Sequence, residues 1–172
     1  MAVEVAVPAP TRLAVPEGVV LRYVGGEPGP VAWRSAPERR VTVVAGEFEP
    51  VLREFLARLR RSLGPIEVYD LGILNRRLTR GGSRISQHAY AAAYDWAGVA
   101  VRRTAGWTVV PVRHASTEWP QFWTLARRLL RYLREAHPGL TVLGPEEEPK
   151  LHSDHVHIGL YPRRVTGAGA TR

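Results

Sequence analysis

Two stretches of the chain repeat apolar residues with the period of an α-helix. In residues 47–63, apolar side chains recur every three or four positions until Gly64. This spacing predicts an amphipathic helix that stops at the glycine. A second such stretch begins near Ser116 or Thr117, either of which suits a helix N-cap, and stops before Pro138. The predicted core stripes are Val51, Leu52, Phe55, Leu56, Leu59 and Leu63 in the first helix, and Phe122, Leu125, Ala126, Leu129, Leu130 and Leu133 in the second.

Short β-type runs alternate with these helices. They are IEVYDLGIL after the first helix, VAVRR and WTVVPVRH on either side of Gly106, and LTVLG and HVHIGLY after the second helix. Two such runs joined by a glycine turn predict a hairpin. Helices and strands that intersperse in this way predict an α+β fold, and we expect a small antiparallel sheet flanked by two main helices.

The length of 172 residues fits one domain with a hydrophobic core of its own. Residues 1–45 are rich in proline and glycine and contain short β-type runs, so we expect an arm or edge strands that belong to the same unit. Residues 46–163 contain the main elements. We expect residues 164–172 to be a disordered tail.

The HVHIGLY run combines polar and apolar residues in alternation. If it is a strand, its period of two puts His155 and His157 on one face and turns Val156 and Ile158 toward the core. His152 precedes this run, in an expected loop from which it can reach the same face.

A further polar pair, His88 and Asp95, lies in SRISQHAYAAAYDWAG. With one histidine of the HVH pair, it makes a set of two histidines and one carboxylate, which suits a catalytic zinc that keeps a fourth position for water. The chain has no cysteine, which excludes thiolate ligands. Spacing alone leaves manganese, iron and nickel open.

Most lone histidines are structural or exposed, and we interpret His114 and His137 in this way. His137 closes a predicted helix, where a cation suits the negative end of the helix dipole. Trp96 follows Asp95 directly, so in a strand it points to the opposite side, and we interpret it as packing.

The net charge of +8 is carried almost wholly by arginine, since Lys150 is the only lysine. A basic surface favours polyanions, although heavy arginine usage is also typical of GC-rich or thermophilic genomes. RRLTRGGSR has the charge to bind phosphates, but no nucleic-acid-binding motif accompanies it, so we do not expect a nucleic-acid partner. No apolar run approaches the roughly 18 residues of a membrane span. The N-terminal stretch lacks the pattern of a signal peptide, and the localisation stays open.

The motif SQHAYAAAYD resembles the SxHxxGxAxD pattern of the zinc D-Ala-D-Ala metallopeptidases, the superfamily of lysostaphin-type and Hedgehog-like folds. Together with SDHVHIG, it is most similar to the bacterial extensin-like C-terminal domain family, whose two motifs occur in the same order. The resemblance covers roughly residues 66–160 and marks residues 46–163 as a metallopeptidase-like domain.

The resemblance implies a zinc peptidase that acts on peptidoglycan stem peptides or crosslinks. It implies that the zinc ligands are His88, Asp95 and His157, and that His155 is the general base or orients the attacking water. It further implies that His152 is an additional active-site histidine. Arg77 would polarise the scissile carbonyl, and Ser86 would be a supporting or substrate-contacting hydroxyl. Asp154 either orients a ring nitrogen of a histidine or belongs to an exposed loop.

Several positions depart from the family pattern. Ala91 replaces the motif glycine, Gly159 replaces a carboxylate after HVH, and the cysteines common in exported relatives are missing. These departures bear on substrate and compartment. An alternative function, which the small size, the missing signal-peptide pattern and the basic charge fit, is a non-catalytic, zinc-containing cell-wall-binding module or a structural part of a phage tail or lysis system. Retention of His155 favours an active peptidase, which a virion or holin could deliver as an endolysin.

Overall fold

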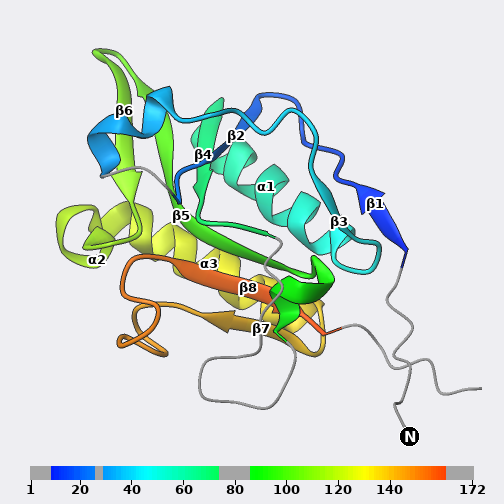
Figure 1. Cartoon of the computed structure of the whole chain (residues 1–172). Coiled ribbons are helices and arrows are strands. Elements are labelled where there is room, and N and C mark those ends of the chain that lie inside the picture. The colour runs from blue at the N-terminus through cyan, green and yellow to red at the C-terminus, as the bar shows by residue number, and fades with distance from the viewer. Residues whose placement is uncertain (1–8, 26–28, 74–85, 162–172) are drawn as a thin grey trace, which may run out of the picture.

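The computed structural model describes residues 9–25, 29–73 and 86–161 (Figure 1). Within these ranges the chain forms three α-helices, two 3-10 helices and eight strands. In chain order they are β1 Pro10–Arg12, β2 Val19–Tyr23, η1 Pro30–Ser35, β3 Val43–Ala45, α1 Glu49–Leu63, β4 Ile66–Asp70, η2 Gln87–Tyr90, β5 Ala93–Arg103, β6 Gly106–Pro111, α2 Ala115–Glu118, α3 Pro120–Ala136, β7 Leu140–Leu143 and β8 Val156–Leu160.

The fold is α+β, as predicted, but the expectation of a small antiparallel sheet is wrong. The main sheet has six strands and is mixed, with the order β2-β4-β5-β8-β7 and with β6 paired to β5. β2 runs parallel to β4, whereas the other pairs are antiparallel. A parallel pair needs a long crossover, and here that crossover includes α1, so no local turn signal in the sequence indicates it.

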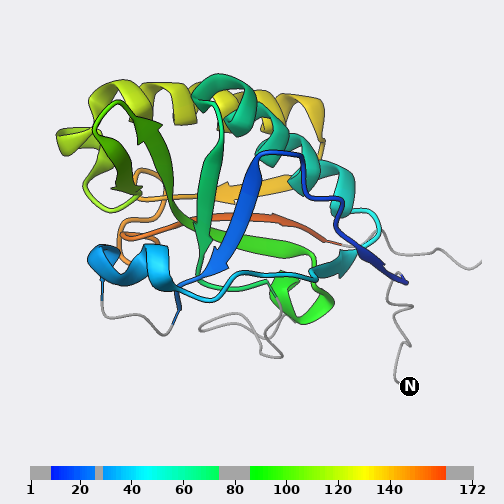
Figure 2. The ribbon, with the colours of Figure 1, turned by 90° about the horizontal axis from the view of Figure 1, so that it is seen from above.

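Both long helices cover the same face of the sheet (Figure 2). The predicted stripe of α1 is buried from Val51 to Leu59, and Gly64 ends the helix with a φ of 80°. On α3 the buried residues are Trp123, Ala126, Leu130 and Leu133. Trp123 was missed in the predicted stripe, and Phe122 and Leu129 are only partly buried. The helices thus leave the opposite face of the sheet to η1, η2 and the segment that leads into β3 (Figure 2).

The long strand β5 connects the two halves of the sheet. Its first half pairs with β8 and its second half pairs with β6. Tyr94 and Trp96 pack in the core beneath the helices, and Trp96 makes an edge-on contact with Phe55 on α1, which confirms the prediction that Trp96 is a packing residue. Asp95, between them, is turned by the strand alternation to the face that the helices leave uncovered.

In the described part of the chain, no helix is long and apolar enough to cross a membrane. This agrees with the expectation from the sequence that the chain contains no membrane span.

Candidate metal centre

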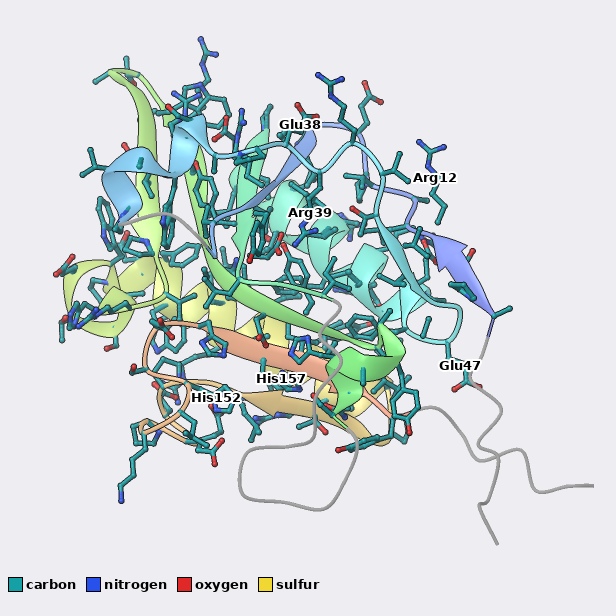
Figure 3. All side chains as sticks on the ribbon, viewed as in Figure 1. Arg12, Glu38, Arg39, Glu47, His152 and His157 are labelled. Carbon is teal, nitrogen blue, oxygen red and sulfur yellow. The ribbon has the colours of Figure 1, made fainter. Side chains whose placement is uncertain are left out.

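Two of the three predicted ligands lie opposite each other on neighbouring strands. Asp95 on β5 and His157 on β8 are Cα partners in an antiparallel pair. Val156 and Ile158 flank His157 and are buried in the core beneath the helices. The predicted alternation along HVHIG is therefore confirmed, and it places the imidazole of His157 on the uncovered face of the sheet (Figure 3). The carboxylate of Asp95 lies beside it.

The third ligand comes from the short 3-10 helix η2, just before β5. Ser86 caps this helix, because its Oγ accepts a hydrogen bond from the backbone N–H of His88 at 3.3 Å. The helix ends at Tyr90, and its C-cap residue Ala91 has a left-handed backbone with φ 53° and ψ 31°. A glycine adopts this conformation without strain, whereas an alanine adopts it at a cost. The turn brings His88 back over the start of β5.

The three side chains converge on one point. His88 Nε2 lies 3.1 Å from Asp95 Oδ1, and His157 Nδ1 lies 2.9 Å from the same oxygen. The two ring nitrogens are 3.2 Å apart. One ligand atom from each residue falls within 4.8 Å of the others, so the group could hold a metal ion.

The outer nitrogens of both rings contact oxygens that set their tautomers. His88 Nδ1 donates to the backbone carbonyl of Ile73 at 2.9 Å, since a carbonyl can only accept. His157 Nε2 lies 2.7 Å from Gln87 Oε1, and the amide nitrogen of Gln87 donates to Thr141 Oγ1 at 3.1 Å. The oxygen of Gln87 therefore faces His157 and accepts its N–H.

With the outer nitrogens protonated, neutral rings turn their lone pairs toward each other and toward the carboxylate. Protonation of both inner nitrogens would instead put two N–H donors 3.2 Å apart. A single cation between the three atoms satisfies all of them, and outer hydrogen bonds of this kind are typical of metal-bound histidines. The arrangement therefore fits a metal ion better than it fits a hydrogen-bonded cluster.

The position of Gln87 depends on a glycine in β8. A Cβ built on Gly159 would lie 2.3 Å from Gln87 Oε1 and 2.8 Å from His157 Nε2. Because Gly159 has no side chain, the amide of Gln87 has room to contact the imidazole of His157. Gln87 and Thr141 were missed by sequence reasoning, although Gln87 stands next to His88 in the first motif.

The electrostatics of Asp95 agree with a site for positive charge. Burial raises the pKa of this carboxyl, but without a metal the contacts with His157 and His88 outweigh the burial when a ring proton faces the carboxylate, and they hold the pKa below its ordinary value. Asp95 is therefore an anion at neutral pH.

His155 and His152 lie at the rim of the cluster. His155 Nε2 is 3.8 Å from Asp95 Oδ1, and His155 Nδ1 is 2.7 Å from Asp154 Oδ1. A carboxylate can only accept, so Asp154 keeps the proton on Nδ1 and leaves the Nε2 lone pair on the side of Asp95. The expectation that Asp154 orients a ring nitrogen thus has a geometric basis.

The ring of His152 is centred 4.9 Å from that of His155 and 5.9 Å from that of His157 (Figure 3). Its Nδ1 lies 2.8 Å from Glu148 Oε2, but without the geometry of a hydrogen bond. Burial and the two neighbouring histidines lower the pKa of His152, so it is neutral at pH 7. Of the predicted site residues, Arg77 lies outside the described residues, and the others gather on this face of the sheet.

The family model for the extensin-like protein C-terminus matches residues 44–169, which is well over half of the chain. This protein belongs to the extensin-like C-terminal family. The family resemblance expected from the two histidine motifs is therefore confirmed. Comparison with curated proteins and with solved structures gave no match.

Proposed function

We propose that this extensin-like protein is a zinc-dependent peptidase that hydrolyses an amide bond in peptidoglycan stem peptides or crosslinks. The observation that carries the proposal is the convergence of His88 Nε2, His157 Nδ1 and Asp95 Oδ1, with His155 Nε2 at the rim. The likeness of its motifs to those of the zinc D-Ala-D-Ala metallopeptidases supports the reaction type and the substrate class.

Zinc is the metal that we propose, because imidazole and carboxylate ligands suit it and because three protein ligands are typical of catalytic zinc. When bound, zinc lowers the pKa of its water to about 7 and polarises the substrate carbonyl. His88, Asp95 and His157 hold the ion, and Ile73 and Gln87 keep both rings in the tautomer that ligation needs.

His155 is the proton carrier in this proposal. Its Nε2 accepts a proton from the attacking water while a C–O bond forms at the carbonyl carbon. The proton then passes to the amide nitrogen as the C–N bond breaks, so that the products are a carboxylic acid and an amine. An imidazole suits both transfers because its unperturbed pKa of about 6.5 lies near the working pH.

Three further residues complete the proposed machinery. Arg77 shares the negative charge that develops on the carbonyl oxygen, a role that depends on its position before the first motif. His152, neutral and next to His155, contacts the substrate or the leaving group. Ser86 supports the site through the turn that holds His88.

One observation favours a second candidate, a non-catalytic zinc module that binds cell wall or forms part of a phage tail. His155 Nε2 is only 3.8 Å from Asp95 Oδ1, so a small movement would make it a fourth ligand. Four protein ligands close a zinc site and leave no position for water.

Metal content and turnover together separate the two candidates. We expect about one zinc per chain in the wild type by elemental mass spectrometry, and little in His88→Ala with Asp95→Ala. His155→Ala should keep its zinc and lose peptidoglycan cleavage by about 10²–10⁴-fold. Loss of zinc from His155→Ala would favour the closed module. A wild type that takes up no zinc at neutral pH would contradict both, and His114→Ala is the control for loss of an exposed histidine.

A further inference from the structure

A cleft opens beside the metal centre, on the face of the sheet that the helices leave uncovered. Its volume is about 520 Å³. The segment that leads into β3 forms one wall with Arg39, Arg40, Thr42 and Val43, and Tyr23 and Ile73 line the rest. Figure 2 shows this segment and η2 on the same side of the sheet.

Ile73 belongs to both sites. Its side chain lines the cleft, and its carbonyl accepts the hydrogen bond of His88 Nδ1 at 2.9 Å. Since this carbonyl contacts the outer side of the His88 ring, Ile73 links the cleft wall to the metal centre through His88. This proximity makes the cleft a candidate for binding a part of the substrate that does not react.

The cleft presents a guanidinium that is held in one orientation. Arg39 Nε donates to Asp70 Oδ2 at 2.9 Å, and its Nη2 donates to Asp70 Oδ1 at 2.6 Å. Asp70 is fully buried, and the Arg39 guanidinium stacks over the ring of Tyr23 at 5.0 Å. Nη1 makes neither bond to Asp70, and a fixed guanidinium edge is well suited to a carboxylate.

A buried hydroxyl in the cleft wall also lacks a partner. Thr42 is 5% exposed, and its Oγ1 makes no hydrogen bond within the described part of the chain. Buried polar atoms of this kind are rare, because each one forfeits its bonds to water. A ligand with an amide group in the cleft would satisfy it. Val41 and Val43 on the same wall are exposed and offer contact to small apolar side chains.

We propose that this cleft binds a carboxylate-bearing arm of a peptide substrate, with Arg39 and Arg40 as the carboxylate contacts and Thr42 as the contact to a peptide group. The inference rests on the proposed function, since it assigns the substrate arm of the same site. Glu38 also lines the cleft, and its negative charge would disfavour a carboxylate ligand.

The test measures binding rather than turnover. The probes are acetyl-Ala-Glu-Ala-Ala-amide and acetyl-Ala-Gln-Ala-Ala-amide, which differ by one carboxylate. They are titrated into the full-length protein carrying His155→Ala, so that no cleavage intervenes, and binding is followed by NMR of the valine methyl groups. We expect the glutamate peptide to bind about fivefold more tightly and to shift the methyl signals of Val41 and Val43.

Substitutions of a basic and of an acidic residue in the cleft should change the preference for the glutamate peptide in opposite directions. Arg40→Gln should reduce it about fivefold, whereas Glu38→Gln should raise it about twofold. Arg61→Gln on α1 makes the same charge change as Arg40→Gln on the helical side and should have no effect. Equal affinity of the wild-type cleft for the two peptides would overturn the inference.

Thr42→Val separates a ligand contact from a structural role. Replacement of an unpaired buried hydroxyl by a methyl group should leave Tm equal to or above that of the parent and weaken both peptides about fivefold. A drop in Tm with unchanged peptide affinity would show that Thr42 is structural and would remove it from the proposed site.

Zinc uptake and cleavage without any carboxylate preference would contradict the cleft inference alone. A carboxylate preference without zinc or cleavage would contradict the peptidase proposal instead.

Discussion

Two aspartates on neighbouring strands, Asp70 and Asp95, show two ways in which one sheet buries a carboxylate. Asp70 on β4 pairs with Trp96, the residue after Asp95 on β5. Asp70 is bound by Arg39 through charged hydrogen bonds from Nε and Nη2. Asp95 instead faces the inner nitrogens of His88 and His157. Asp70 thus has a partner that is always a cation, whereas the histidines beside Asp95 are cations only when they are protonated.

The pKa values of the two carboxyls move in opposite directions. Burial raises the pKa of Asp70 in spite of Arg39. Burial also raises the pKa of Asp95, but the contacts with His157 and His88 lower it by more. The net effect is a pKa below the ordinary value. The comparison teaches that Asp70 belongs to the framework, while Asp95 belongs to a cluster that could hold a metal ion.

Removal of the permanent cation should have the largest effect on stability. Arg39→Met leaves Asp70 buried without its partner and should lower the free energy of unfolding by about 3–5 kcal/mol. Urea denaturation of both proteins measures this. Arg40→Met, at the next residue and exposed, should stay within about 0.5 kcal/mol of the wild type. Similar losses in the two variants would show that the Arg39–Asp70 pair has no special role.

An added cation should stabilise only the second site. Zinc at 100 times its Kd should raise the free energy of unfolding by about 2.7 kcal/mol, because it binds the folded state. His88→Ala should abolish this gain, and His114→Ala and Arg40→Met should keep it. Thermal denaturation with zinc and with a chelator measures the gain, and a gain that persists in His88→Ala would place zinc elsewhere.

The two carboxyls should affect the free energy of unfolding differently at acid pH, once a chelator has removed any bound metal. The folded-state pKa of Asp95 lies below its unfolded value of about 3.9, so its contribution to stability is complete above that pH and is lost as the pH falls further. For Asp70 the folded-state pKa is raised, so its contribution grows as the pH falls through that value. Between about pH 5 and 3, the wild type should therefore lose on the order of 1 kcal/mol of its free energy of unfolding through Asp95. Asp95→Asn should remove this loss. Urea titrations across this range measure it, and an unchanged pH slope would contradict the assignment.

The turn that carries His88 should give the smallest effect. Ala91 has a φ of 53°, which an alanine adopts at a cost, so Ala91→Gly should stabilise the protein by about 0.5–1 kcal/mol. Ala89→Gly, inside the same short helix, should destabilise it by a similar amount. Thermal denaturation measures both, and equal effects of the two glycines would exclude strain at Ala91.

Much of this protein was readable from short-range sequence patterns. The stripe from Val51 to Leu59 and the glycine after it located α1, because helical periodicity and its stop signals are local. Alternation along HVHIG separated His157 from Val156 and Ile158 for the same reason. The motif around His88 and Asp95 indicated the family to which the chain belongs.

Other features were decided only when distant segments met. The parallel pairing of β2 with β4 has no turn signal, since the chain between them passes through η1, β3 and α1. The tautomers of His88 and His157 depend on Ile73 and Gln87, and the cleft depends on Arg39 meeting Asp70, 31 positions away. Residue types and spacing determined which side chains can bind a cation. Tertiary contacts decided which nitrogen each ring offers, because hydrogen bonds between remote groups set the position of every proton.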